Sequence, residues 1–306
     1  MNILSVQNIS KNYGAIKALQ NISFEVPKAS VFGILGPNGS GKTTLLGIVM
    51  DVLKATNGNY LWLGKPGSNE QRKLIGTLLE TPNFYHYLSG QKNLEIAAEI
   101  KGRDKSDIER VLQIVNLSQR KHSKFSTYSL GMKQRLAIAS ALLGNPDVLV
   151  FDEPTNGLDP AGIAEIRELM LKLCAEGKTI IMASHILDEV EKVCTHVAII
   201  QKGELKTVGT VQEVLNTTTE NKTATIVVEL TADNLEQLKN MIQNFGGAIN
   251  VQQTETMVTA TFEGTITGKQ INKYCFDNGV VLESLQIKKK SLEARFLEIT
   301  GKQSDR

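Results

Sequence analysis

A glycine-rich segment near the start of the chain carries the residue types of a phosphate-binding loop. Residues 36–43 are GPNGSGKT, which fits the spacing G-x-x-x-x-G-K-[ST]. Glycines let the backbone curl so that several N–H groups face one anion, and a helix that starts directly after the loop adds a partial positive charge. Lys42 is then placed to reach the β- and γ-phosphates, and Thr43 to bind Mg²⁺. We therefore expect this segment to bind a nucleotide.

The residues on either side of the loop decide between a binding site and an ordinary turn. The apolar run SVFGILG (30–36) leads into it, and KTTLLGIVMDVL (42–53) follows with the pattern of a helix. A buried strand, a loop and a helix in this order argue against a glycine-rich turn that binds nothing. The residues predicted to contact the nucleotide here are Gly36, Pro37, Asn38, Gly39, Ser40, Gly41, Lys42, Thr43 and Thr44.

Two adjacent carboxylates end a second apolar run, VLVFDE (148–153). Asp152 can hold Mg²⁺, and Glu153 can orient or deprotonate an attacking water. In an extended chain neighbouring side chains point to opposite sides, so we expect one carboxylate to face the metal and the other to face the water. Such a pair taken alone is more often the solvated start of a loop, but the phosphate loop upstream favours a catalytic role.

Several further segments resemble motifs of the ATP-binding-cassette (ABC) ATPase family. Residues 128–135, YSLGMKQR, are similar to the signature LSGGQ-x-Q-R and lie before the strand that ends in Asp-Glu, as that family requires. Residues 156–159, NGLD, resemble the D-loop. His185 resembles the switch histidine, and Tyr13 lies where an adenine-stacking aromatic residue is found. The resemblance covers about residues 1–215.

This resemblance implies two copies packed head to tail with two MgATP at their interface, each held by one copy's phosphate loop and the other copy's signature. It places Tyr13, Ser129, Gly131 and Asp159 against the nucleotide, Glu153 as general base and His185 against the γ-phosphate. A helix that starts near Leu130 would direct its N-terminus toward the phosphate of the opposite copy. The alternatives are a surface aromatic on a turn for Tyr13 and a structural histidine for His185.

The sequence departs from the family pattern at two places. Glu80 replaces the usual glutamine of the Q-loop, so a carboxylate would approach Mg²⁺ and the water, unless Glu80 is a plain polar loop residue. Leu130 and Met132 replace a glycine and a glutamine of the signature. Both departures, with ETPNFYHYLSGQKNL (80–94) and SLEARFLEIT (291–300), resemble the ABC-2 type exporter branch that handles bacitracin, lantibiotics and other antimicrobial compounds. That resemblance implies a homodimer that drives a separately encoded permease from the cytoplasmic face of a bacterial membrane.

The elements that must position these residues follow from the periodicity of the chain. Residues 1 to about 30 alternate apolar and polar residues, which predicts short antiparallel strands. Apolar residues recur at helical spacing in 93–100, 106–117 and 133–143, so the segment from about 84 to 145 should be helical. The strands around 148–153 and 178–185 flank a helical run, 161–177, which predicts a mostly parallel sheet. We predict an α/β P-loop ABC ATPase fold over residues 1–216, with an antiparallel β subdomain and a helical subdomain.

A second, smaller domain is expected after the polar linker NTTTENKTA (216–224). Residues 223–306 show the order strand, helix, strand, strand, helix, strand, followed by a last helix, which is the ferredoxin-like α+β pattern. Many functions use this fold, so it says little about role; a regulatory or dimer-stabilising module is our expectation.

Composition and charge argue against a nucleic-acid-binding, a disulfide-bonded and a membrane-spanning protein. The net charge is +2, from 34 basic and 32 acidic residues, which provides no argument for a nucleic-acid partner. The three cysteines are widely spaced, as in reduced cytosolic proteins. The chain contains no signal-peptide pattern and no apolar run of about 18 residues, so we expect it not to cross a membrane.

Two rival functions remain within this resemblance. One is a soluble ABC ATPase that acts on ribosomes or nucleic acid, but such relatives usually carry two cassettes or long coiled coils, whereas this chain has one phosphate loop and no sustained heptads. The other is a module that binds ATP without turning it over. Glu153 and His185 argue against that module.

Overall fold

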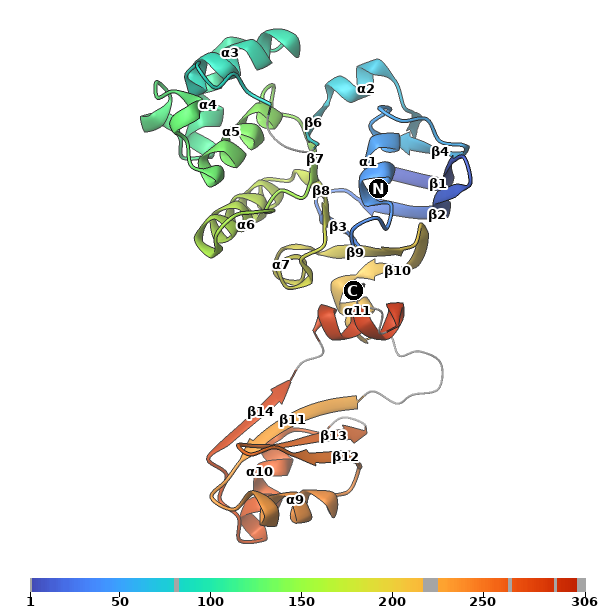
Figure 1. Ribbon diagram of the computed structural model, residues 1–306, viewed down its shortest axis with the longest axis vertical. Helices are drawn as coiled ribbons and strands as arrows, with labels where there is room; N and C mark the ends of the chain where they lie inside the picture. Colours follow the sequence, from blue (N-terminus) through green and yellow to red (C-terminus); the bar gives the residue numbers. More distant parts are fainter. Residues whose placement is uncertain (1, 80–82, 217–224, 264–265, 289–290, 302–306) are drawn as a thin grey trace. The chain divides into compact units, whose positions relative to one another are not determined.

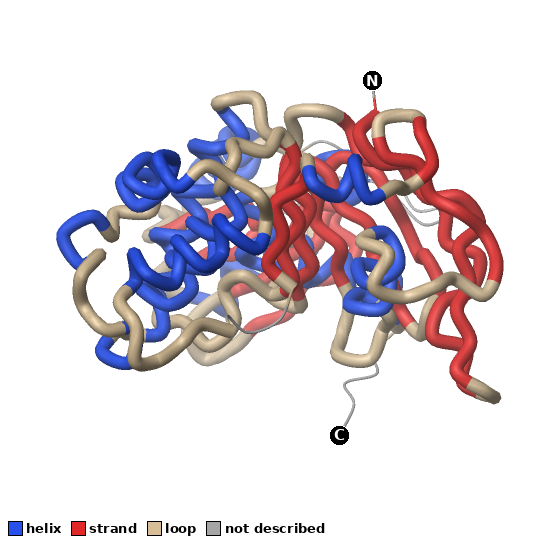
Figure 2. Tube along the Cα trace, turned by 90° about the horizontal axis from the view of Figure 1, so that it is seen from above, coloured by secondary structure: helices blue, strands red, loops and turns tan. Residues whose placement is uncertain are grey.

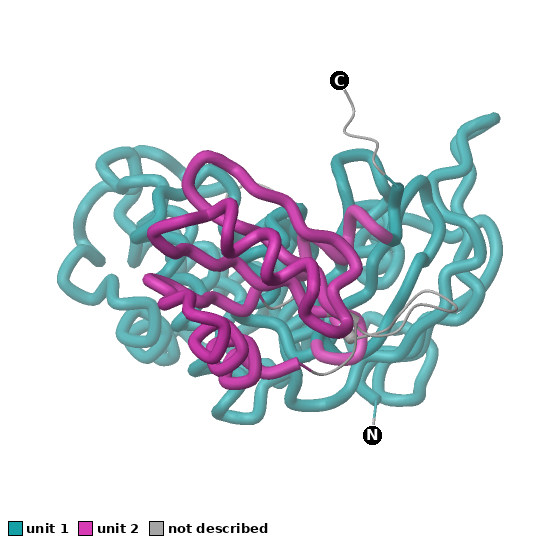
Figure 3. Tube along the Cα trace, turned by 90° about the horizontal axis from the view of Figure 1, so that it is seen from below, with its two compact units in different colours: residues 1–211, 299–306 teal, residues 212–298 magenta. Residues whose placement is uncertain are grey.

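The computed structural model describes residues 2–79, 83–216, 225–263, 266–288 and 291–301 (Figure 1). The chain forms two compact units, residues 1–211 with 299–306 and residues 212–298 (Figure 3). The buried Arg295 of helix α11 (Leu292–Thr300) donates from Nε to the carbonyl of Val214 of helix α8 (Val211–Asn216) at 3.1 Å, and both of these residues belong to the second unit.

Six strands form the central sheet of the first unit, in the order β10-β9-β3-β8-β7-β6. Strands β3, β6, β7, β8 and β9 are parallel, and β10 is antiparallel to β9. The bounds of these strands are β3 (Val31–Leu35), β6 (Ile75–Leu78), β7 (Val148–Asp152), β8 (Thr179–Ser184), β9 (His196–Gln201) and β10 (Glu204–Thr210). Every residue of β3, β7 and β8 is buried, as expected for parallel strands covered on both faces. The predicted mostly parallel sheet is confirmed.

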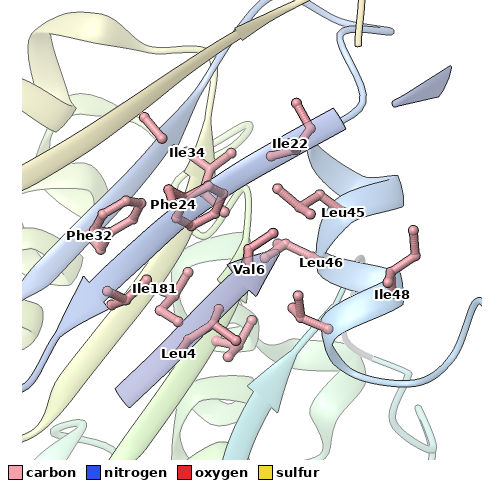
Figure 4. Close-up of a cluster of buried hydrophobic side chains, with 14 of the residues drawn as sticks. Leu4, Val6, Ile22, Phe24, Phe32, Ile34, Leu45, Leu46, Ile48 and Ile181 are labelled. Carbon is pink, nitrogen blue, oxygen red and sulfur yellow. The ribbon is translucent and has the colours of Figure 1, made fainter. Parts of the chain in front are cut away.

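A second sheet of the first unit is antiparallel, with the order β2-β1-β4-β5. Its strands are β1 (Asn2–Tyr13), β2 (Ile16–Pro27), β4 (Asn57–Trp62) and β5 (Lys65–Pro66). Buried residues of this sheet, of helix α1 (Lys42–Val49) and of the central sheet form one hydrophobic cluster (Figure 4). Phe24 of β2 stacks on Phe32 of β3 with ring centroids 5.3 Å apart. This packing holds the end of β3 and the start of α1 in place.

The segment from residue 83 to 145 is helical, as predicted. It contains α3 (Gly90–Ile100), α4 (Ile108–Ile114) and α5 (Leu130–Leu142), with short 3₁₀ turns at Lys105–Asp107, Ser118–Arg120 and Phe125–Thr127. In this segment the structure shows one isolated β-bridge, Ser89 to Lys124, and no strand. These helices gather on one side of the first unit, away from β1, β2 and β4 (Figures 1 and 2).

The remaining helices of the first unit are α2 (Asn69–Lys73), α6 (Pro160–Ala175) and α7 (Leu187–Val193). Helix α6 matches the predicted helix of residues 161–177, and Gly177 follows it with φ +91°, the conformation typical of a helix C-terminus. No helix in the described part of the chain combines the length and apolar character needed to cross a membrane.

The second unit contains the ferredoxin-like arrangement that the sequence predicts. Its elements are β11 (Thr225–Thr231), α9 (Leu235–Gln243), β12 (Ala248–Gln253), β13 (Val258–Glu263), α10 (Gly268–Asp277) and β14 (Ser284–Lys288). The sheet is antiparallel with the order β12-β13-β11-β14. Buried residues of α9, α10 and the sheet form a core separate from that of the first unit.

Candidate functional site

The phosphate loop, residues 36–44, connects β3 to α1, as its sequence context predicts. Gly36 cannot be replaced without a clash, because a Cβ there would lie 2.2 Å from the carbonyl oxygen of Ile200. Gly41 has φ +108°, and a Cβ there would lie 2.7 Å from the carbonyl oxygen of Ala18. Glycine is therefore required at both positions by the backbone of neighbouring segments.

The start of α1 has the donors that an anion needs. Gly41 is the N-cap residue, and no side chain in the described part of the chain caps this helix. The first backbone N–H groups of a helix have no partner inside it, so these groups are available to a ligand. The Ser40 hydroxyl is buried and has no hydrogen-bond partner among the described residues. The loop therefore fits a phosphate chain.

Lys42 lies folded over its own loop. Its ammonium donates to the carbonyl oxygens of Gly36 at 2.8 Å and Pro37 at 3.2 Å, and the residue is only 6% exposed. Thr43 and Thr44 lie in the first turn of α1, and Asn38 and Gly39 form the exposed tip of the loop. The residues of this segment that are predicted to contact the nucleotide thus lie around the N-terminus of helix α1.

Three chemically different side chains meet at the carboxyl ends of adjacent parallel strands. Glu153 follows β7, and His185 follows β8. One carboxylate oxygen of Glu153 lies 2.9 Å from Nδ1 of His185, and the other lies 3.6 Å from the ammonium of Lys42. Loops at the carboxyl ends of such strands are where α/β sheets place their ligands. The structure therefore joins the phosphate loop, the carboxylate and the histidine in one site.

The extended backbone expected at both Asp152 and Glu153 is wrong for Glu153. Asp152 is the last residue of β7 and is buried, but Glu153 is no longer extended, since its φ is +48°. The chain turns here because the Glu153 N–H donates to the Ala183 carbonyl and the Glu153 carbonyl accepts from the Asn156 N–H. The turn, not strand pleating, therefore directs the Glu153 side chain toward Lys42 and His185.

The proposed metal ligands differ in what the structure says of them. Asp152 is buried at the end of β7, and Thr43 is exposed in the first turn of α1. The described residues contain no group of three or more His, Cys, Asp or Glu side chains suited to a metal. Mg²⁺ needs only one or two protein carboxylates when phosphate oxygens supply further ligands, so Asp152 and Thr43 suit that ion. Glu80 lies outside the described residues.

Tyr13 ends β1 and is 46% exposed. The ammonium of Lys11 lies 4.9 Å from its ring centroid. Gly14 follows with φ +58° and turns the chain toward β2. The ring is available for stacking, and its contact with adenine stays a prediction.

The signature residues lie at an open helix end. Ser129 is the N-cap of α5 and accepts a hydrogen bond from the Met132 N–H at 3.3 Å. A Cβ at Gly131 would meet no described residue within 4 Å, so no packing in the described part of the chain requires glycine there. Within the described residues, no hydrogen bond or ion pair joins Ser129 or Gly131 to the phosphate loop. The two halves of the predicted nucleotide site are thus separate in one copy.

Asp159 has a local role that the sequence comparison did not predict. It is the N-cap of α6 and accepts a hydrogen bond from the Gly162 N–H at 3.0 Å. The turn before it contains Gly157, where a Cβ would lie 3.3 Å from Cδ2 of Leu130. The D-loop therefore lies beside the signature of its own chain.

Sequence reasoning missed two features of this site. It did not predict the direct contact between Glu153 and His185, although both follow apolar runs, and adjacent parallel strands would have suggested it. It also passed over Thr155, whose hydroxyl is buried without a partner among the described residues. No pattern in the sequence marks Thr155.

The sequence of this chain is similar to sequences of known proteins. The ABC transporter family matches residues 19–156. The uncharacterized ABC transporter ATP-binding protein YhcH of Bacillus subtilis is 38% identical, over 98% of this chain and 96% of that protein. The bacitracin transport ATP-binding protein BcrA of Enterococcus faecalis is 40% identical, over 66% of this chain and 68% of that protein.

Solved structures extend the comparison to three dimensions. An ATP-binding cassette of an ABC transporter in its ADP conformation is 29% identical, with a TM-score of 0.65 over 70% of this chain and 92% of that chain. A dimeric cassette bound to ADP and Pi after hydrolysis is 26% identical, with a TM-score of 0.60 over 68% of this chain and 98% of that chain. The chain therefore belongs to the family of ABC transporter ATP-binding subunits, which use MgATP and hydrolyse it.

Proposed function

We propose that this chain is the ATPase of an ABC exporter, works as a homodimer on the inner face of the cell membrane, and drives a separately encoded permease that exports a drug, peptide or lipid-like compound. The observation that supports ATP hydrolysis is that Lys42, Glu153 and His185 lie together beside the uncapped start of α1. Export is supported by the similarity to BcrA and to the lantibiotic transport protein SrtF of Streptococcus pyogenes, which is 38% identical over 66% of this chain.

The three side chains divide the chemistry of hydrolysis. Glu153 acts as general base toward the water, and His185 holds its carboxylate in place from the other side. The backbone of the phosphate loop and Lys42 bind the phosphates. Bound Mg²⁺ neutralises charge on the phosphate oxygens. Asp152 and Thr43 would hold that ion.

A second copy completes the site. Among the described residues, only the Ser129 side chain caps the start of α5, and the space beside Gly131 is open, so this helix end suits the γ-phosphate held by the other copy. Closure then depends on ATP, and shifting such an equilibrium from 1:99 to 99:1 takes about 5.5 kcal/mol of differential binding. Hydrolysis removes the contact between the γ-phosphate and α5 of the other copy. The dimer then opens, and this opening changes the conformation of the permease.

A groove of about 650 Å³ beside β6 and α3 suits a cytoplasmic segment of the permease. Its lining includes Tyr85, 51% exposed, and Ile100, 81% exposed, which is unusual for residues of this size. A second groove of about 470 Å³ shares Ile100 and Lys101 with it and adds Arg103. In the described part of the chain neither Lys101 nor Arg103 forms an ion pair with a carboxylate, so an acidic group on the permease segment would be favoured.

The experiment that tests this function is the substitution Glu153→Gln. We expect ATP binding to persist while the turnover of ATP falls by about 10²- to 10⁴-fold, because the amide cannot accept the proton of the water. Phosphate release measures turnover, and Glu109→Gln on α4 is a matched carboxylate-to-amide control outside the site. Near-normal turnover in Glu153→Gln would contradict the assignment, and no phosphate release from the wild type would favour the module that only binds ATP.

The same variant tests the partner. When Glu153→Gln protein with trapped ATP is pulled down from solubilised membranes of the cells that produce this chain, one membrane protein should co-purify with it in a constant ratio. Recovery of ribosomes or nucleic acid instead would favour the soluble ATPase.

A further inference from the structure

The sheet of the second unit has two edge strands, β12 and β14, and they differ in how they are protected. Exposed strand edges pair readily with other chains, and proteins usually guard them with charges, proline or bulges. β14 ends in Lys288, whose ammonium forms an ion pair with Glu229 at 2.6 Å. β12 has the sequence AINVQQ, with no charge and no proline. The β12 edge is therefore the less protected one.

The polar side chains of β12 are directed to solvent along most of its length. Asn250, Gln252 and Gln253 are exposed, and Ile249 is 57% exposed. A register irregularity lies between Ala248 and Asn250, and from Asn250 onward the pairing with β13 is regular. Four consecutive residues of regular edge, about 13 Å at 3.3 Å per residue, are thus available for a new strand.

The chemistry of this edge suits a second copy of itself. Antiparallel pairing of a strand with its own copy has two-fold symmetry, which closes on two molecules. Amide side chains both donate and accept, so Asn and Gln can pair with the same residues across the axis. Charged residues at these positions would repel their own copies. An acidic or basic partner would find no opposite charge on β12.

We propose that β12 pairs antiparallel with β12 of a second copy, so that the second unit is a dimerisation module. This inference rests on the homodimer proposed above and adds a contact that does not depend on ATP. Two copies joined at β12 present their cassettes to each other at an effective concentration of the order of millimolar, so the ATP-dependent contact re-forms readily. The second unit would then keep two cassettes together between rounds of hydrolysis.

The test is Gln252→Lys in the full-length chain, with Gln286→Lys on the β14 edge as the matched control. Without nucleotide, we expect sedimentation to show a wild-type dimer whose dissociation constant rises about tenfold or more in Gln252→Lys, because two like charges are brought close to the two-fold axis. Gln286→Lys should change it less than about twofold. Both variants should keep the melting temperature and the basal ATPase of the wild type.

Cysteine substitutions provide a second test, because a disulfide at a specific position cannot result from unfolding of the variant. In a two-fold antiparallel pair only the residue on the axis lies opposite its own copy, with side chains about 4.5–5.5 Å apart. We therefore expect an intermolecular disulfide on mild oxidation from one of Asn250→Cys and Gln252→Cys, or from a mixture of the two if the axis lies on Val251, and none from Gln286→Cys.

The inference and the proposed function fail in different ways. A wild type that is monomeric without nucleotide, or an unchanged dissociation constant in Gln252→Lys, overturns the β12 contact but leaves an ATP-dependent dimer of Glu153→Gln intact. Absence of a dimer in ATP-trapped Glu153→Gln would overturn the homodimer itself.

Discussion

At the scale of single residues, Glu153 shows how the site is held. Its φ of +48° is uncommon for a residue with a side chain and costs of order 1–2 kcal/mol. The hydrogen bonds from Glu153 N–H to the Ala183 carbonyl and from Asn156 N–H to the Glu153 carbonyl hold this conformation. The gain is that one carboxylate reaches both Lys42 and His185. A strained backbone at this position is therefore consistent with a functional constraint.

His185→Ala should separate binding from turnover. The imidazole contacts Glu153 and not the phosphate loop, so its loss should leave ATP affinity within a few-fold while turnover falls by roughly 10²-fold. Fluorescent-nucleotide titration and phosphate release measure the two quantities. His122→Ala, in the loop before α5, is the control and should change neither. A large loss of ATP affinity in His185→Ala would show that the histidine serves binding instead.

At the scale of elements, helix α5 combines an ordinary core with an unusual start. Every residue from Leu136 to Leu142 except Ser140 is buried, whereas among the described residues nothing lies close enough to Gly131, in the first turn, to require glycine. Glycine within a helix costs about 0.5–1 kcal/mol relative to alanine. A residue that weakens its own helix and is not needed for packing points to a ligand outside the chain.

Gly131→Ala should therefore raise stability and lower function together. We expect the free energy of unfolding in urea to rise by about 0.5–1 kcal/mol. ATP-dependent dimerisation and turnover should fall by roughly 10²-fold, since the added methyl group displaces the phosphate of the other copy. Gly246→Ala in the second unit, where a Cβ also meets nothing, should leave turnover unchanged. Full activity in Gly131→Ala would remove α5 from the nucleotide site.

Lys101 is the C-cap residue of helix α3, and its pKa is lowered although the residue is exposed. Lys101 donates to the Ser140 carbonyl at 2.6 Å, and burial of the ammonium, together with the charge of Arg103, lowers its pKa from 10.5 to about 8. Below about pH 8 the folded chain bears the full cost of this enclosed charge. Between that pH and 10.5 the unfolded chain binds more protons than the folded chain, so the contribution of Lys101 to stability rises with pH.

The free energy of unfolding should report this titration. From about pH 7.5 to about pH 9.5, the wild type should gain stability relative to Lys101→Met, measured by urea unfolding. Lys92→Met, which removes an exposed lysine of α3 and keeps Lys101, should show the same gain as the wild type. An equal pH dependence in the wild type and Lys101→Met would mean that the ammonium is hydrated.

At the scale of the whole molecule, two separate cores predict two unfolding transitions. Leu238 is fully buried in the core of the second unit, and Leu46 in that of the first. Leu238→Ala should destabilise only the second unit, by about 2–5 kcal/mol, and Leu46→Ala only the first. MgATP should raise the melting temperature of the first unit alone, because ligand binding stabilises the unit that holds it. Calorimetry of the full chain separates these effects, and one cooperative transition shifted by both substitutions would contradict independent units.

Local patterns in the sequence were enough to predict much of this molecule. The phosphate loop, the strand ending in Asp152, the helical segment and the order of elements in the second unit follow from spacing and periodicity, which depend on neighbours in the chain. The sequence analysis left β4, β6, β9 and β10 unpredicted, and β1 and β2 are longer than the short strands expected. These strands acquire their pairing from distant segments, and a short apolar run alone does not specify its partner.

Only the tertiary structure decided how the site is assembled. The contact of Glu153 with His185 arises because β7 and β8 are adjacent and parallel, so residues far apart in sequence leave the sheet at the same edge. The need for glycine at position 36 comes from the backbone of Ile200 in β9, and the freedom at Gly131 from the absence of any neighbour within 4 Å. Such constraints are distances between segments that meet on folding. The sequence by itself therefore predicted which residues could do the chemistry, and tertiary packing determined which of them meet within one copy.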